Sequence, residues 1–142
     1  MIFKGFLARF GVIMRSYARE AAFCKIYTYI MSGQFDGDWS QFDQSLLTDE
    51  DVRFAQSLVE GVIEHKSELD GIVAEFSKQY KLSRIYRLDL AGLELALYEM
   101  RYTDTPHPVV INEAVGFAKK YSTDKSVSYV NGVLAGYERS LS

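Results

Sequence analysis

The chain has 142 residues, of which 48% are hydrophobic and 25% charged, and its net charge is −3. This length suits one domain, and the composition is that of a globular protein with its own core. A single cysteine, Cys24, excludes an internal disulfide framework and an all-cysteine metal site. It fits a reducing cytoplasm, where we expect the protein to reside.

Residues 1–13 form an apolar N-terminal segment that is interrupted by Lys4 and Arg9. These charges, and the lack of a convincing small-residue cleavage site, argue against a cleaved signal peptide. We expect residues 1–13 to be an extension, either disordered or due to an upstream start before Met14, and residues 14–142 to form one domain. No segment reaches the roughly 18 uninterrupted apolar residues of a membrane span, so we expect no membrane partner.

The charge is distributed unevenly along the chain. Residues 1–34 carry five basic residues and one acid, a net charge of +4, which leaves −7 on the remaining residues. A basic segment on an acidic body indicates one localised anion-binding face, although a chance excess of surface charge explains it equally well.

Apolar residues recur at three- and four-residue steps over most of the chain, which is the period of a helix packed on a core. Thr48, followed by three acids, is a helix-start signal. Residues 85–102 are apolar on nearly every side, as in a central helix buried by its neighbours. This spacing predicts helices over 15–31, 49–63, 67–80, 85–102, 108–121 and 127–141, and allows a short seventh around Trp39, Phe42 and Leu46. The predicted fold is an all-α, single-domain bundle of about six or seven helices.

Signals for catalysis are weak. The two histidines, His65 and His107, lie far apart in the sequence, and no zinc-protease, paired-cysteine, nucleophile-elbow or phosphate-loop motif occurs. We therefore expect no catalytic residues, no metal and no cofactor, and hence no enzyme.

The first predicted helix holds the clearest binding signal. Arg15 and Arg19 are four residues apart and share one helix face, with Tyr17, Tyr27 and other aromatic residues interleaved. Arginine contacts phosphates and tyrosine stacks on unpaired bases, so this pattern favours RNA binding. Aromatic residues at these spacings, however, more often belong to a helical core.

Five blocks of the sequence resemble the NusB family and occur in the family's order. The blocks INEAV and VNGVL, correctly spaced, form a specific signal when they occur together. The five are RSYAREAAFCKIY (15–27), LVEGV (58–62), DLAGLELALYEM (89–100), PHPVVINEAVGFAKKYS (106–122) and SYVNGVL (128–134). The sequence departs from the family pattern at Cys24, where a glutamine is usual, and at Glu94, where a basic residue is typical.

The resemblance implies a helical domain of two packed subdomains that acts in transcription antitermination. The implied partners are boxA-type single-stranded RNA, the ribosomal protein NusE and the transcribing RNA polymerase complex; some members of the family also form a homodimer. The resemblance places Asp89 near the protein-partner face. The residues that it places at the RNA are Arg15, Arg19, Tyr27, Lys125 and Tyr129.

Two other interpretations stay open. The chain is alternatively a helical protein-interaction module without RNA binding of its own, which recovery of a protein partner without RNA would favour. An unrelated helical enzyme is the third interpretation, and it lacks a recognisable constellation of catalytic residues.

Overall fold

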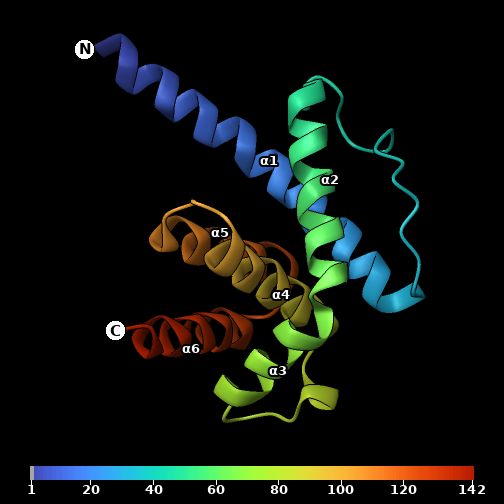
Figure 1. Ribbon diagram of the computed structural model, residues 1–142, viewed down its shortest axis with the longest axis vertical. Coiled ribbons are helices and arrows are strands. Elements are labelled where there is room, and N and C mark those ends of the chain that lie inside the picture. The colour runs from blue at the N-terminus through green and yellow to red at the C-terminus, as the bar shows by residue number, and fades with distance from the viewer. Residues whose placement is uncertain (1) are drawn as a thin grey trace.

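The computed structural model describes the backbone of residues 2–142 and the side chains of residues 15–142. Within that range the chain forms helices and connecting segments without a strand (Figure 1), so the predicted all-α bundle is confirmed. The side chains of residues 1–13, where the sequence analysis expected an extension, lie outside the described residues. The extension therefore stays a prediction. The elements are α1 (Ile2–Ser32), α2 (Asp49–Glu64), α3 (Lys66–Phe76), a 3-10 turn η1 (Leu82–Arg84), α4 (Arg87–Tyr102), α5 (His107–Tyr121) and α6 (Asp124–Ser140).

Helix α4 is the centre of the bundle, as its apolar sequence predicted. It contacts α1, α2, α3, α5 and α6, and every residue from Asp89 to Leu97 is buried. Around it, α1 and α2 pack on each other, and so do α5 and α6, while α3 lies against α4 and α6. The surroundings of α4 thus divide into two groups of helices, in line with the two packed subdomains that the family resemblance implied.

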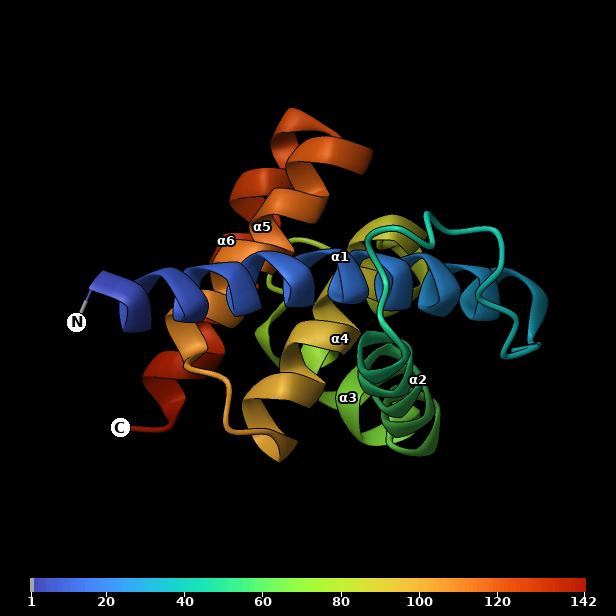
Figure 2. The same cartoon turned by 90° about the horizontal axis from the view of Figure 1, so that it is seen from above.

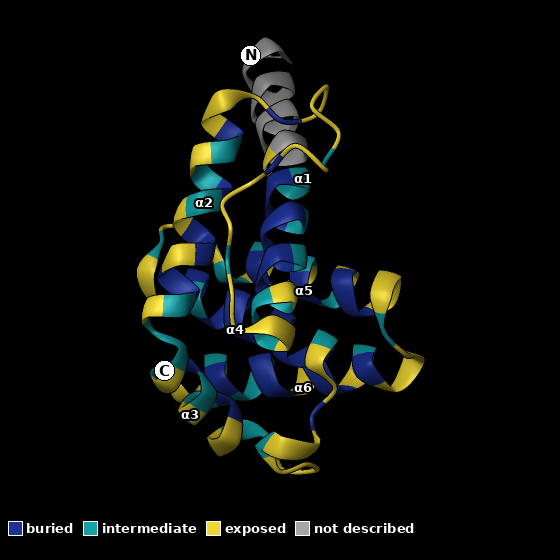
Figure 3. Cartoon of the chain, turned by 90° about the vertical axis from the view of Figure 1, so that its right-hand side faces the viewer, coloured by how far each residue is buried: buried dark blue, intermediate teal, exposed yellow. Residues whose placement is uncertain are grey.

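Helix α1 crosses above α4 (Figure 2) and presents small side chains to the bundle. Ala18, Ala21 and Ala22 are fully buried, which lets the helix backbones approach closely, and Phe23 and Ile26 fill the space on either side. Figure 3 shows buried residues along the coloured part of α1, and mostly exposed ones along the connection between α1 and α2. The start of α2 has the predicted cap, because the Thr48 hydroxyl accepts a hydrogen bond from the Asp51 backbone N–H at 3.1 Å.

The prediction of a short helix around Trp39, Phe42 and Leu46 is wrong, because this segment forms turns between α1 and α2. Three aspartates there accept hydrogen bonds from the backbone N–H two residues further on, at 2.9 to 3.0 Å. Such local bonds offer the backbone an alternative to helical pairing. Trp39 is nevertheless buried, and its indole N–H donates to Gln56 on α2 at 2.8 Å. The apolar residues of this segment therefore anchor a loop to the bundle and do not mark a helix.

The apolar stripe of α3 predicted that this helix would extend to Tyr80. Helix α3 instead ends at Phe76. Ser77 leaves the helical conformation, and its hydroxyl hydrogen-bonds both the Tyr80 carbonyl oxygen, at 2.8 Å, and the Tyr129 hydroxyl on α6, at 2.6 Å. The chain is thereby turned toward α6, so that Tyr80 belongs to an exposed connection between α3 and α4.

Candidate nucleic-acid interface

A pocket of about 320 Å³ lies where the start of α4 meets the start of α6. Three residues that the sequence resemblance selected, Asp89, Lys125 and Tyr129, line it together. Exposed residues of the connection between α3 and α4 complete its rim. We call this site the junction pocket; its lining residues are Tyr80, Arg84, Ile85, Tyr86, Asp89, Thr123, Lys125, Ser126 and Tyr129.

Asp89 is the buried charged group of the junction pocket, and the buried Ser126 lies beside it. One carboxylate oxygen, Oδ2, accepts a hydrogen bond from the Ser126 hydroxyl at 2.7 Å. The other oxygen, Oδ1, is buried and has no hydrogen-bond partner among the described residues. An unpaired buried acceptor is costly, so Oδ1 marks a hydrogen-bonding capacity of the pocket that the described residues leave unsatisfied.

Aromatic rings form one wall of the same pocket. Tyr129 is buried, and burial raises the pKa of its hydroxyl. The ring of Tyr80 meets it edge-on, with 5.3 Å between ring centroids, and is itself 44% exposed. Tyr86 is 62% exposed beside them. Tyr129 thus supports the site from within, whereas Tyr80 and Tyr86 offer accessible stacking faces.

The connection between α3 and α4 is a basic segment that the sequence analysis missed. Residues 78–87 contain four cations, at positions 78, 81, 84 and 87, and no acid, with Tyr80 and Tyr86 between them. The sequence analysis summed the charge over all residues after residue 34, and the many acids in that range concealed this basic segment. A search for short basic stretches with interleaved aromatic residues would have found it.

The two arginines of α1 differ in their surroundings. Arg15 is exposed, and its guanidinium lies 5.2 Å from the centre of the Phe54 ring on α2. Arg19 is 3% exposed, and its Nε donates to both carboxylate oxygens of Glu99 on α4, at 2.9 and 3.0 Å. Burial raises the pKa of Glu99, although Arg19 opposes this shift. Arg15 is therefore free to meet a ligand, while Arg19 is held by a buried carboxylate.

Tyr27 follows Arg19 by eight residues on α1, which is about two helical turns. It is half-buried, and it shares a face of α1 with Glu20, which is seven residues earlier. Glu20 accepts a hydrogen bond from the Tyr121 hydroxyl, at the end of α5, at 2.7 Å. Tyr27 thus lies further along this face, toward the segment that joins α5 to α6.

The predicted site residues therefore fall into two groups, which lie beside different positions along the axis of α4. Asp89, in the junction pocket, precedes Glu99, the partner of Arg19, by ten residues. At 1.5 Å per helical residue, the two positions lie about 15 Å apart along the helix axis. The structure brings Asp89, Lys125 and Tyr129 together, and it leaves Arg15 and Arg19 beside the other position.

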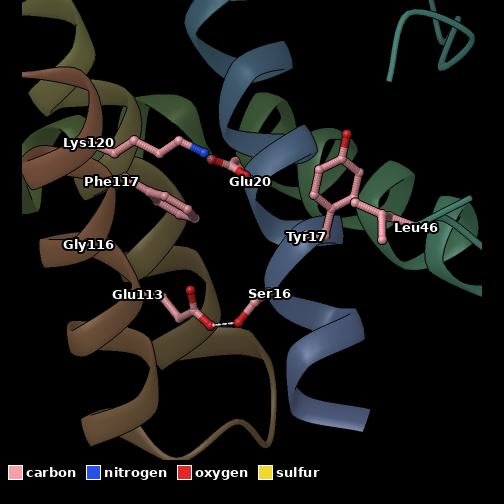
Figure 4. Close-up of a pocket in the computed structure, with 8 residues that line it drawn as sticks. All are labelled: Ser16, Tyr17, Glu20, Leu46, Glu113, Gly116, Phe117 and Lys120. Carbon is pink, nitrogen blue, oxygen red and sulfur yellow. Dashed lines mark hydrogen bonds and ion pairs between the residues drawn. The ribbon is translucent and has the colours of Figure 1, made fainter. Parts of the chain in front are cut away.

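A groove of about 390 Å³ separates α1 from α5 near these arginines (Figure 4). Its two carboxylates are already engaged: Glu113 accepts a hydrogen bond from the Ser16 hydroxyl, and Glu20 pairs with Lys120 at 2.5 Å. Phe117 lies at its apolar base. With two acids against one cation, this groove is poorly suited to a polyanion.

Both histidines are tied into the helical framework. The His65 ring stacks on Tyr102, with 4.3 Å between ring centroids, and its Nδ1 lies 3.2 Å from Glu68. His107 lies within hydrogen-bond distance of Glu138, at 2.5 Å, and of the Met100 carbonyl oxygen, at 3.1 Å. Among the described residues, no group of histidine, cysteine or acidic side chains is arranged to hold a metal ion. Nor is any helix in the described part of the chain long and apolar enough to cross a membrane.

The sequence is similar to known transcription proteins. The model of the NusB family matches residues 16–139. The transcription antitermination protein NusB of Acetivibrio thermocellus is 42% identical over 125 residues, which cover 84% of this chain and 85% of the relative. The NusB protein of Syntrophotalea carbinolica is 39% identical over 139 residues, which cover 85% and 89%.

Solved structures share the fold. NusB of T. maritima superposes with a TM-score of 0.75 at 27% identity, covering 88% of this chain and 90% of that one. A chain in the crystal structure of the antitermination factors NusB and NusE in complex with double-stranded RNA gives a TM-score of 0.73 at 22% identity. That match covers 89% of this chain and 97% of the other. At this identity, the second likeness concerns the fold alone.

Proposed function

Because the chain belongs to the NusB family, we propose that it serves transcription antitermination as an adaptor that binds boxA-type single-stranded RNA together with a NusE-type ribosomal protein. One observation carries the proposal: the junction pocket combines exposed cations, accessible tyrosines and a buried carboxylate with a free oxygen. The adaptor makes and breaks no covalent bond, and it works in the cytoplasm within the transcribing RNA polymerase complex.

Phosphate contacts supply the salt-dependent part of RNA affinity in this proposal. Arg84 and Lys125 are exposed on the rim of the junction pocket, and no acid among the described residues forms an ion pair with them. Each cation that neutralises a phosphate releases counterions and steepens the salt dependence of binding. Tyr80 and Tyr86 supply base stacking, which favours unpaired over paired RNA.

Asp89 serves the protein partner. A carboxylate oxygen repels phosphates but accepts hydrogen bonds from N–H groups, and Oδ1 of Asp89 is buried without a partner in the described part of the chain. We therefore assign Asp89 to a donor of the NusE-type protein, with the cations around it directed to RNA. A homodimer that covers this pocket would compete with both ligands.

On α1, we assign RNA contact to Arg15 and a positioning role to Arg19. For Arg19 to reach a phosphate, it would have to leave Glu99 buried and unpaired, which costs several kcal/mol. Tyr27, half-buried on the face that leads to the α5–α6 connection, continues the binding surface from Arg15 toward Lys125.

The test is a titration of the chain with a boxA-type RNA, with and without the NusE-type protein, at two salt concentrations. We expect tighter binding with the protein present and weaker binding at high salt. Combining Arg84→Ala and Lys125→Ala should reduce affinity and lower the salt slope by about 1.4, at about 0.7 per phosphate contact on a single strand. Lys119→Ala, which removes an exposed lysine of α5 outside the pocket, is the matched control.

Binding of the NusE-type protein without any RNA dependence would instead favour the protein-interaction module. RNA affinity that is unchanged in the double variant, with the wild type binding well, would remove the junction pocket from the RNA surface.

A further inference from the structure

A second, longer groove runs beside the junction pocket, between the end of α3 and the length of α6. It encloses about 1030 Å³ and shares Tyr80, Lys125 and Tyr129 with the junction pocket, so the two form one continuous depression. We call it the α3–α6 groove; its further lining residues are Glu75, Phe76, Lys78, Gln79, Ser128, Gly132, Val133, Gly136 and Arg139.

We propose that the α3–α6 groove binds a further stretch of the same single-stranded RNA, beyond the part held in the junction pocket. The inference rests on the proposed function and extends it, because it assigns RNA contacts to Lys78 and Arg139. Neither residue belongs to the RNA-binding set that the resemblance implied.

The charge of the groove suits a polyanion. Lys78, Lys125 and Arg139 are exposed along it, against the single acid Glu75. None of the three cations forms an ion pair with an acid among residues 15–142. Some other basic residues of the bundle are paired with acids, as Lys120 is with Glu20. Charges left unpaired along one depression favour an anionic ligand over an apolar helix of a partner protein.

The shape of the groove suits a chain of flat bases. Gly132 and Gly136 are one helical turn apart and so share a face of α6. A Cβ at Gly132 would meet nothing within 4 Å, so this part of the floor is open. Phe76 borders the groove at Gly136, and the exposed ring of Tyr80 stands at its junction with the first pocket. Stacking on such rings accepts any base, as single-strand binding requires.

The length of the groove sets the length of RNA. From Lys125 to Arg139 the helix axis advances about 21 Å, at 1.5 Å per residue. At about 3.4 Å per stacked nucleotide, this distance accommodates roughly six nucleotides. The proposal therefore predicts that affinity depends on RNA length beyond the core element.

The test compares two RNAs in the presence of the NusE-type protein: a short boxA-type RNA, and the same RNA with about six additional nucleotides at each end. We expect the wild type to bind the longer RNA roughly tenfold more tightly, the gain typical of one or two stacked bases. Lys78→Ala combined with Arg139→Ala should abolish most of that gain, and leave affinity for the short RNA unchanged. Gly132→Leu, which fills the open floor, should do the same.

The matched control is Lys119→Ala combined with Arg53→Ala, because both residues are exposed and lie outside the groove. Circular dichroism establishes that each variant is folded, and the double alanine variant decides the matter if Gly132→Leu does not fold. A wild type that binds both RNAs equally well overturns the inference and leaves the proposed function intact. A wild type that binds neither RNA overturns both. Loss of affinity for the NusE-type protein, with an unchanged length dependence, would make the groove a protein interface and overturn its RNA assignment.

Discussion

The guanidinium of Arg19 on α1 and the carboxylate of Glu99 on α4 form a buried ion pair, with 2.9 Å between Nε and Oε2. Both side chains are almost fully buried, and the hydroxyl of Thr105 lies 3.3 Å from the same carboxylate. The pair joins the first helix to the central one. An arginine that resembles an RNA-binding residue in sequence thus has a structural partner within the chain.

Arg19→Ala should lower the free energy of unfolding by about 3–5 kcal/mol, because it leaves Glu99 buried without its partner. Arg15→Ala, on the same helix face but exposed, should change stability by less than about 0.5 kcal/mol and still weaken RNA binding. Urea denaturation measures the first effect and RNA titration the second. Replacing both members of the pair, with Arg19→Met and Glu99→Leu, should recover much of the lost stability. Native stability in Arg19→Ala alone would contradict the positioning role.

Gly61→Ala should destabilise the packing of α2 on α4. A Cβ at position 61 would lie 2.1 Å from Cζ of Tyr98 on α4, and real atoms do not approach so closely. We expect a loss of roughly 1–3 kcal/mol in urea denaturation, the usual cost of overpacking. Gly71→Ala is the matched control, because a Cβ there meets nothing within 4 Å and alanine favours the helix by about 1 kcal/mol. Adding Tyr98→Ala to the Gly61 variant should relieve the clash; if it does not, the close contact is not the cause.

The sequence predicted those parts of the fold that local patterns determine. Helix α4 was recognisable because apolar residues surround it, and α2 because Thr48 precedes three acids. Two errors arose where side chains compete with the helical backbone: the aspartates before α2 form turns, and Ser77 diverts the chain toward Tyr129. The helices were predicted from apolar residues three and four positions apart, and this pattern carries no information on either hydrogen bond.

Prediction of the site was limited by contacts distant in sequence. The spacing of Arg15 and Arg19 places both on the same helix face. The acid that pairs with Arg19, however, lies 80 residues away in the sequence. Asp89, Lys125 and Tyr129 came from family resemblance, and only the folded chain places them in one pocket with Tyr80. The basic stretch at 78–87 was visible in the sequence, and an average over a long acidic region concealed it.

Glu94 should make stability depend on pH. It is fully buried on α4, where Oε2 lies 2.6 Å from Nζ of Lys66 and Oε1 has no partner among the described residues. Burial, with Asp70 nearby, raises the pKa of Glu94 above its ordinary value. The folded state therefore keeps this proton to higher pH than the unfolded state does. The stability that this group contributes is complete below the unfolded pKa and is lost as pH rises through the folded pKa.

Glu94→Gln imitates the protonated side chain, so it should flatten the fall in unfolding free energy with rising pH. The slope it removes is at most about 1.4 kcal/mol per pH unit. Urea denaturation of wild type and variant from pH 5 to pH 8 measures this difference, and subtraction cancels the contribution of Glu99, whose pKa is also raised by burial. A variant whose deficit grows with pH would mean that Glu94 is ionised beside Lys66.

Asp89→Asn should separate binding from stability in the junction pocket. The amide oxygen can still accept the Ser126 hydroxyl, and the smaller cost of burying a neutral group offsets the cost of the unpaired amide N–H groups, so the unfolding free energy should change little. A donor from the NusE-type protein would no longer find its acceptor, and calorimetry should record roughly tenfold weaker binding. Asp124→Asn, at the exposed first turn of α6, controls for loss of negative charge. If affinity for the protein is unchanged while RNA binds more tightly, Asp89 acts by repelling phosphates, and its assignment to the protein partner is wrong.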